Sequence, residues 1–316
     1  MEARRIGGLD VSVVGVGCNN FGGRIDADRS VRVVHAALDE GINLFDTADI
    51  YGGGGGSEEA LGRALAGRRD EAIVATKFGG RMPDGGSGGR PQYVRQACDA
   101  SLERLGVDHI DLYQQHFPDE DTPVAETLGA MSELVDAGKV VHIGCSNYRA
   151  DQLDRAQRSA SARGLRPLAS VQNELSLLSE ADDHASLIAH MERFDVMFLP
   201  YYPLASGLLT GKYTRAAAPP PGTRLGRSER TRARWMTDAN VDAAQRLGAW
   251  AAERGHTLLE LAFSWLAAQP RVASVIAGAT SPEQVAQNAA AVDWTLSAHD
   301  LDEIATLRPA GAHGRA

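Results

Sequence analysis

Cysteine is scarce in this sequence: its 316 residues include three, Cys18, Cys98 and Cys145, with no CxxC or other paired spacing. An odd, sparse set argues against a disulfide framework or a zinc cluster and fits a reducing, cytoplasmic location. The nine histidines form no HExxH or HxH pattern. We therefore expect no metal centre.

Excess positive charge and long apolar runs are also missing. The formal net charge is −9, and no basic stripe is interleaved with aromatic residues, which argues against a nucleic-acid groove. No run approaches the roughly 20 apolar residues of a membrane span. The first residues, MEARRIGGLDV, lack the apolar run of a secretory signal. We expect a cytoplasmic protein that binds neither nucleic acid nor membrane.

Short apolar segments alternate with helical patterns along the whole chain, of which 43% is hydrophobic. After an N-terminal hairpin, we predict strands over residues 13–17, 41–46, 73–77, 109–116, 140–146, 169–173, 196–200 and 272–277. We predict helices over residues 30–40, 58–66, 91–105, 124–137, 149–162, 180–193, 239–254, 257–268, 282–290 and 298–307. Residues 201–235, rich in Gly, Pro and Arg, form a long connecting segment.

Strict alternation of eight strands with helices calls for parallel pairing through right-handed crossovers. The expected fold is α/β, a (β/α)8 TIM barrel with an N-terminal hairpin and an extra C-terminal helix, in a single domain over residues 1–316. A doubly wound open sheet is the alternative. It needs a phosphate loop directly after the first strand, and GVGCNN at residues 15–20 lacks the G-x-G-x-x-G spacing.

The segment GINLFDTADIYGGGGGSEE, residues 41–59, places Asp46 and Tyr51 just past the carboxyl end of a strand. Side chains there face the mouth of a barrel. The glycines at 52–56 let the backbone pass close to a ligand, and Ser57 followed by two acids is typical of a helix N-cap. On this segment alone, an ordinary strand–helix turn explains the residues equally well.

Two further polar residues end neighbouring strands, Lys77 the third and His116 the fourth. Alone, each is more often a hydrogen-bonded or solvated bystander, but a barrel brings both to the face that carries Asp46 and Tyr51. The pKa of a free tyrosine is about 10. A lysine cation stabilises its anion, an aspartate holds the lysine, and a histidine donates a hydrogen bond to a substrate oxygen and shares the proton.

Several separate motifs, in order along the chain, resemble the aldo-keto reductases. They are GINLFDTADIYGGGGGSEEALGRAL, IVATKFG, LGVDHIDLYQQHFPD, GKVVHIGCSN, VQNELSLL, YYPLASGLLTGKY and VIAGATSPEQVAQN. The resemblance implies a barrel that reduces an aldehyde or ketone to the alcohol with NAD(P)H, and a catalytic tetrad at Asp46, Tyr51, Lys77 and His116. The pattern is similar to the branch with bacterial reductases and potassium-channel β subunits.

The resemblance also implies which residues bind the cofactor. They are Gly17, Cys18 and Asn19 on the pocket floor, Ser146, Asn147 and Gln172 at the nicotinamide carboxamide, Tyr201 against its ring, Leu204, Ser206, Gly207 and Lys212 along the pyrophosphate, and Gly278, Thr280, Gln284, Gln287 and Asn288 at the adenosine. A lysine and an arginine that grip the 2′-phosphate in many relatives correspond to Gly278 and Gln284. Thr280 and Arg224 take that role here, and NADPH is expected in preference to NADH. Without the resemblance, Ser146 and Asn147 would be helix-cap residues and Tyr201 a packed aromatic.

Two other functions are compatible with these residues. One is an NADPH-binding, redox-sensing regulatory subunit with little turnover, and the other is a lyase or aldolase that uses Lys77 as a Schiff base. The small-molecule carbonyl substrate would be selected by the loops at 20–25, 79–90 and 201–235. Phe21, Phe117 and Trp235 are either apolar walls of that pocket or packing residues. The sequence leaves the substrate and the oligomeric state open.

Overall fold

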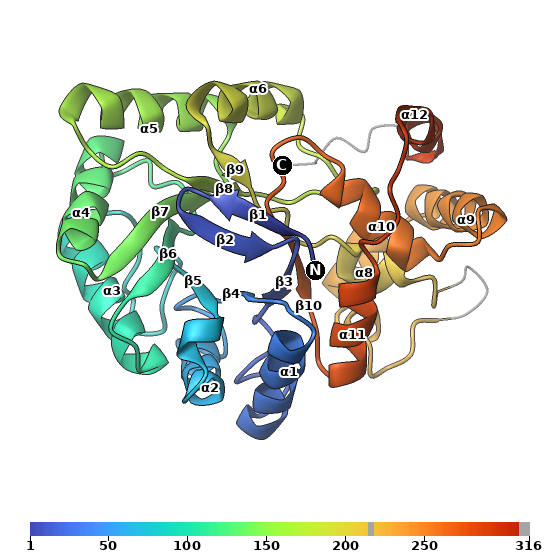
Figure 1. Ribbon diagram of the computed structural model, residues 1–316, viewed down its shortest axis with the longest axis horizontal. Helices are drawn as coiled ribbons and strands as arrows, with labels where there is room; N and C mark the ends of the chain where they lie inside the picture. Colours follow the sequence, from blue (N-terminus) through green and yellow to red (C-terminus); the bar gives the residue numbers. More distant parts are fainter. Residues whose placement is uncertain (214–217, 310–316) are drawn as a thin grey trace.

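A parallel sheet forms the centre of the molecule (Figure 1), of which the computed structural model describes residues 1–213 and 218–309. Every neighbouring pair of its strands is parallel. In spatial order the strands are β10 (Val275–Gly278), β3 (Val14–Gly17), β4 (Leu44–Asp46), β5 (Ile73–Phe78), β6 (Ile110–Gln115), β7 (Val140–Ser146), β8 (Ser170–Gln172) and β9 (Met197–Phe198).

The two edge strands of this sheet meet and close it into a barrel. Phe198 of β9 forms a parallel bridge with Val272, just before β10. The Phe198 N–H donates to the Arg271 carbonyl at 2.8 Å, and the Ala273 N–H donates to the Phe198 carbonyl at 2.9 Å. Closure leaves neither edge open for pairing, and the predicted (β/α)8 barrel is confirmed.

Helices surround the barrel (Figure 1), and every predicted helix is present. They are α1 (Ala27–Asp39), α2 (Gly56–Leu65), α3 (Pro91–Leu105), α4 (Val124–Asp136), α5 (Ala150–Arg163), α6 (His184–Phe194), α9 (Asp238–Glu253), α10 (Leu258–Ala267), α11 (Pro282–Ala290) and the C-terminal α12 (Ala298–Leu307). The long segment at 201–235 adds three short elements that the sequence did not predict: η2 (Ala205–Thr210), α7 (Arg224–Arg227) and α8 (Glu229–Trp235). A short turn, η1 (Arg69–Glu71), precedes β5.

The predicted N-terminal hairpin covers one end of the barrel. Its strands β1 (Ala3–Ile6) and β2 (Leu9–Ser12) pair antiparallel, and the fully buried Ile6 and Val11 pack against inward-facing Leu44, Leu112 and Leu199. Leu44 and Leu112 each lie two residues before a polar residue, Asp46 or Gln114 on the same strand. The hairpin thus closes the amino-terminal end of the strands and leaves the carboxyl end for a site.

The predicted N-cap role of Ser57 is wrong. Helix α2 begins at Gly56, after Gly55 with a φ of 107°, and has no side-chain cap. The left-handed conformation of Gly55 begins the helix one residue earlier, so Ser57 lies inside the helix. Its hydroxyl does not cap the helix and can bond elsewhere. Ser57 Oγ donates to the Cys18 carbonyl at 2.8 Å and shares a hydrogen bond of 2.8 Å with Thr47 Oγ1. It ties together the loops that follow β3 and β4.

Candidate active site

Four polar side chains gather at the carboxyl end of the barrel. Asp46 is the last residue of β4, Tyr51 follows it by five positions, Lys77 is the penultimate residue of β5, and His116 follows β6. Asp46, Tyr51 and His116 line a cavity of about 680 Å³, and Lys77 lies beneath it with no exposed surface. The structure therefore brings together the four residues that the sequence predicted at the ends of neighbouring strands.

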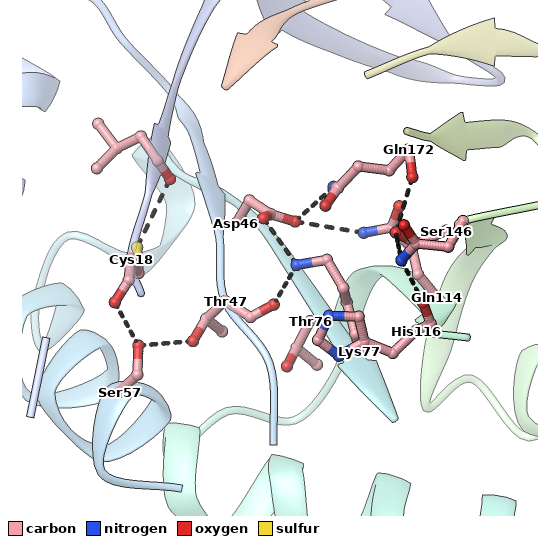
Figure 2. A network of polar contacts seen from close by, with 12 residues as sticks. Cys18, Asp46, Thr47, Ser57, Thr76, Lys77, Gln114, His116, Ser146 and Gln172 are labelled. Atoms are coloured by element: carbon pink, nitrogen blue, oxygen red, sulfur yellow. Dashed lines mark hydrogen bonds and ion pairs between the residues drawn. The ribbon is translucent and has the colours of Figure 1, made fainter. Parts of the chain in front are cut away.

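The Asp46–Lys77 pair is the buried centre of the site (Figure 2). Lys77 Nζ donates to Asp46 Oδ2 at 2.7 Å and to the Thr47 carbonyl at 2.8 Å. Burial lowers the pKa of Lys77, but the charge and hydrogen bond of Asp46, together with the neighbouring Tyr51, outweigh burial, and the net pKa is raised above its ordinary value. Lys77 is therefore a fixed cation at neutral pH, which argues against the Schiff-base alternative because that chemistry needs a neutral amine.

Tyr51 lies over this cation. Lys77 Nζ is 5.1 Å from the centroid of the Tyr51 ring. Removal from bulk water raises the pKa of Tyr51, and the Lys77 charge offsets only part of that rise, so the net pKa is raised above its ordinary value. Tyr51 is consequently a protonated phenol at neutral pH, with a cation in place to stabilise the anion that remains after it gives up its proton.

His116 stands edge-on to Tyr51, with 5.7 Å between the ring centroids, and stacks on Phe117 at 4.4 Å. Burial, and then the Lys77 charge, lower the pKa of His116 to about 3. Within residues 1–213 and 218–309 its Nδ1 has no hydrogen-bond partner. A neutral imidazole can donate one hydrogen bond to a substrate oxygen, but it carries no second proton to share at neutral pH.

The cavity extends from the tetrad to the loops after β3, β7, β8, β9 and β10. Apart from Cys18, every predicted cofactor residue lines it: Gly17, Asn19, Ser146, Asn147, Gln172, Tyr201, Leu204, Ser206, Gly207, Lys212, Arg224, Gly278, Thr280, Gln284, Gln287 and Asn288. Its volume lies within the range of about 300–1,000 Å³ typical of ligand pockets. Lys212, Arg224 and Arg24 contribute cationic groups to its lining, so the donor set fits an elongated ligand that carries phosphates.

Comparison with known proteins decides the family. The profile described as "Aldo/keto reductase family" matches residues 13–309. The chain belongs to the aldo/keto reductase family. It is an oxidoreductase, and its family uses a nicotinamide cofactor, NADP(H) in general.

Relatives of this aldo/keto reductase match nearly its whole length. An L-glyceraldehyde 3-phosphate reductase of Escherichia coli K12 is 34% identical over 94% of this chain and 89% of its own. A probable voltage-gated potassium channel subunit beta of Arabidopsis thaliana is 32% identical over 93% and 92%. The solved structure of a glycerol dehydrogenase from Gluconobacter oxydans superposes with a TM-score of 0.83 at 32% identity, over 96% of this chain and 94% of its own.

Cys18 does not line the cavity, so its predicted place on the pocket floor is wrong. Its side chain is fully buried and its Sγ lies 3.6 Å from the Val16 carbonyl. Gly17 and Asn19, on either side of it, do line the cavity. Neighbouring residues of an extended chain point to opposite sides, and Cys18 points into the apolar layer between the sheet and the helices.

Ser146, Asn147 and Tyr201 form one network with the tetrad rather than a helix cap. Helix α5 begins later, at Ala150. Asn147 has a left-handed φ of 61°, donates to the His116 carbonyl at 2.9 Å and accepts from the Tyr201 hydroxyl at 2.7 Å. Ser146 Oγ donates to the Gln172 carbonyl at 2.7 Å. This network fixes the backbone that carries His116.

Arg224 bridges two loops at the far end of the cavity. It is the first residue of α7, and its guanidinium donates to Asn19 Oδ1 at 3.3 Å and to Asn20 Oδ1 at 3.2 Å. Thr280 also lines the cavity, and both its N–H and its hydroxyl donate to Gln284 Oε1. In the described part of the chain Arg224 has no carboxylate partner within 4.0 Å. Its charge therefore remains available to an anionic ligand.

Sequence reasoning missed Arg24, which also lines this cavity. Its guanidinium donates to the Gly222 carbonyl at 3.1 Å and so reaches the long segment 201–235 from the loop after β3. That loop was predicted to select the substrate, but a single arginine next to glycines does not indicate where its side chain points. The contact partner lies 198 positions away in the sequence.

The predicted substrate loops contribute unequally. The segments 20–25 and 201–235 supply cavity-lining residues, whereas no residue of 79–90 does. Phe117, 44% exposed, lines the cavity, while Phe21 and Trp235 are buried packing residues. Of the three aromatic residues that the sequence suggested as apolar walls, only Phe117 therefore lines the pocket.

A buried carboxyl, Asp49, lies in the turn that carries Tyr51. Its Oδ1 has no partner among the described residues, and the Tyr93 hydroxyl is 3.5 Å from its Oδ2. Burial, and then the charge of Glu58, raise the pKa of Asp49 to about 7. We therefore expect Asp49 to titrate near neutral pH, separately from Tyr51.

Two features are not found in the described part of the chain, a cluster of three or more possible metal ligands and a helix that could span a membrane. Its His, Cys, Asp and Glu residues do not cluster in threes as metal ligands do. None of its helices combines the length and the apolarity that crossing a membrane requires.

Proposed function

We propose that this enzyme reduces an aldehyde or ketone to the alcohol with NADPH, and that Tyr51 supplies the proton. The observation that carries the proposal is a protonated tyrosine on the cavity, above a buried cation and beside a neutral histidine. Tyr51 is the acid, Lys77 stabilises its conjugate base, and His116 can hold the oxygen that receives the proton. The relative named as an L-glyceraldehyde 3-phosphate reductase supports an aldehyde substrate.

The bound reduced nicotinamide would supply the hydride to the carbonyl carbon. Tyr51 donates its phenolic proton to the substrate oxygen as negative charge develops there, and the phenolate that remains is stabilised by Lys77. The neutral His116 donates a hydrogen bond to the same oxygen and orients the carbonyl. Hydride and proton thus add across one C=O bond, and oxidation of the alcohol reverses both transfers.

Residues around the cavity would hold the cofactor. Ser146, Asn147 and Gln172 would hold its carboxamide and Tyr201 its ring. The Gln172 Nε2 already donates to Asp46 Oδ1 at 2.9 Å, which leaves Gln172 Oε1 as its acceptor for the carboxamide NH₂. In the pyrophosphate loop Ala205 and Ser206 have left-handed φ of 45° and 58°. Such a conformation costs roughly 1–2 kcal/mol per non-glycine residue and is typical of a ligand-binding loop.

A single-turnover experiment tests the proposed reaction. The enzyme is loaded with one equivalent of NADPH and mixed with nitrobenzaldehyde, and nicotinamide absorbance is followed. We expect complete oxidation of the bound NADPH within seconds. A redox-sensing regulatory subunit would bind NADPH and oxidise it only over many minutes, and that result would replace our proposal with the regulatory function.

Arg224 is expected to select NADPH over NADH. Arginine grips phosphate with paired, charge-assisted hydrogen bonds worth about 1.5–3 kcal/mol, and the acidic protein offers no attractive overall field. Arg224→Ala should raise the Michaelis constant for NADPH roughly tenfold or more and leave that for NADH nearly unchanged. The exposed Arg230→Ala is the matched control. Equal effects on both cofactors would mean that Arg224 only holds the loops through Asn19 and Asn20.

A further inference from the structure

Gln114 is a buried amide inside the barrel, below the cavity. It lies on β6, in register with Lys77 of β5 on one side and Gly144 of β7 on the other. Its side chain has no exposed surface. Its Nε2 donates to Asp46 Oδ1 at 3.3 Å (Figure 2), and its Oε1 has no partner among the described residues.

The Asp46 carboxylate is held by three side chains from three other strands. Gln114 Nε2 and Gln172 Nε2 donate to Oδ1 at 3.3 and 2.9 Å, and Lys77 Nζ donates to Oδ2 at 2.7 Å. Two amides on one oxygen restrict rotation of the carboxylate, so its other oxygen stays directed at Lys77. Asp46 in turn fixes where the Lys77 charge lies under the Tyr51 ring.

The strand next to Gln114 leaves room for its side chain. A Cβ at Gly144 would lie 3.2 Å from Gln114 Cγ and 2.4 Å from Ser170 Oγ. A side chain at position 144 would therefore collide with its neighbours. A buried amide with one unpartnered oxygen costs about 1–3 kcal/mol of stability relative to a satisfied one. This cost argues against a role for Gln114 in packing alone.

We propose that Gln114 is a positioning residue for proton transfer: it fixes the Asp46 carboxylate and thereby keeps Lys77 beneath Tyr51. The inference rests on the proposed function, because it concerns the proton that Tyr51 gives. Gln114 does not line the cavity, so it acts on the chemical step and not on binding of substrate or cofactor.

The test compares two neighbouring buried glutamines. Gln115, also on β6, faces away from Asp46 and accepts from the Tyr148 hydroxyl at 2.7 Å. Gln114→Met and Gln115→Met each remove one amide from the same strand at similar volume. We expect Gln114→Met to lower kcat for nitrobenzaldehyde reduction roughly tenfold with KM unchanged. In alcohol oxidation, where Tyr51 must be deprotonated to act as the base, the rise of the rate with pH should move to higher pH, because Lys77 then offsets less of the effect of burial on the pKa of Tyr51. Gln115→Met should keep the parent kcat and pH profile.

A second variant preserves shape and tests the same contact. In Gln114→Glu, a protonated carboxyl can donate to Asp46, whereas an ionised one repels it. The ratio of its reduction rate to that of the parent should fall as pH rises. Thermal unfolding of all three variants shows which are folded. If Gln114→Met and Gln114→Glu are folded and match the parent in kcat and pH profile, Gln114 has only a packing role. A parent enzyme without turnover would instead overturn the proposed function.

Discussion

Replacing Tyr51 with Phe is expected to lower kcat for aldehyde reduction by roughly 10²–10⁴-fold, the contribution of a positioned general acid. The ring stays, so the edge contact with His116 and the position over Lys77 are preserved. NADPH affinity, measured by fluorescence titration, should change little. Only the proton donor is lost.

The matched control removes a hydroxyl elsewhere in the barrel. Tyr113 is fully buried on β6, and its hydroxyl donates to the Val94 carbonyl at 3.3 Å, away from the cavity. Tyr113→Phe should lower the free energy of unfolding by about 1 kcal/mol with kcat unchanged. If Tyr51→Phe reduces aldehydes at nearly the parent rate, another group gives the proton and the assigned mechanism is wrong.

The positions of the four tetrad residues followed from the sequence because a parallel barrel brings all strand ends to one face. Asp46, Lys77 and His116 each end a predicted strand, so their common location needed only the correct strand count. Their protonation states did not follow. The pKa of about 3 for His116 depends on burial and on the Lys77 charge, and both arise only after β5 and β6 have paired.

Side-chain direction explains the other differences between sequence and structure. Cys18 lies between two cavity residues and points away from the cavity, since a change of one position reverses a side chain on an extended chain. Gln114 and Gln115 look alike in the sequence. Alternation puts Gln114 on the same face as Leu112. Its hydrogen-bond partner Asp46 is 68 positions away, however, and no local sequence pattern predicts that contact.

The long segment at 201–235 shows a limit of local patterns. Its short elements depend on contacts made after folding: η2 contains Ser206 and Gly207 with φ of 58° and 99°, and α7 is four residues long. Helices this short have no stability of their own. Cavity-lining residues such as Arg24 and Arg224 are placed by contacts between this segment and the loop after β3, which sequence periodicity does not encode.

Lys77→Met is expected to lower both stability and activity. Asp46 and Lys77 are buried and 2.7 Å apart, and removing one partner of a buried ion pair costs about 3–5 kcal/mol because the other charge is left uncompensated. Urea unfolding measures this loss. For alcohol oxidation, where Tyr51 must act as a base, the variant also lacks the cation that lowers the pKa of Tyr51. The rise of its oxidation rate with pH should therefore move to higher pH, away from the Asp49 titration near 7.

A double variant separates the two effects. Lys77→Met with Asp46→Asn removes both charges, so most of the lost stability should return, because no buried charge is left unpaired. Activity should not return, since neither the cation nor its anchor is present. If the double variant unfolds at the same urea concentration as Lys77→Met, the destabilisation does not come from the unpaired carboxylate. If Lys77→Met keeps the parent pH profile, the Lys77 charge does not act on Tyr51, and the ion pair serves stability alone.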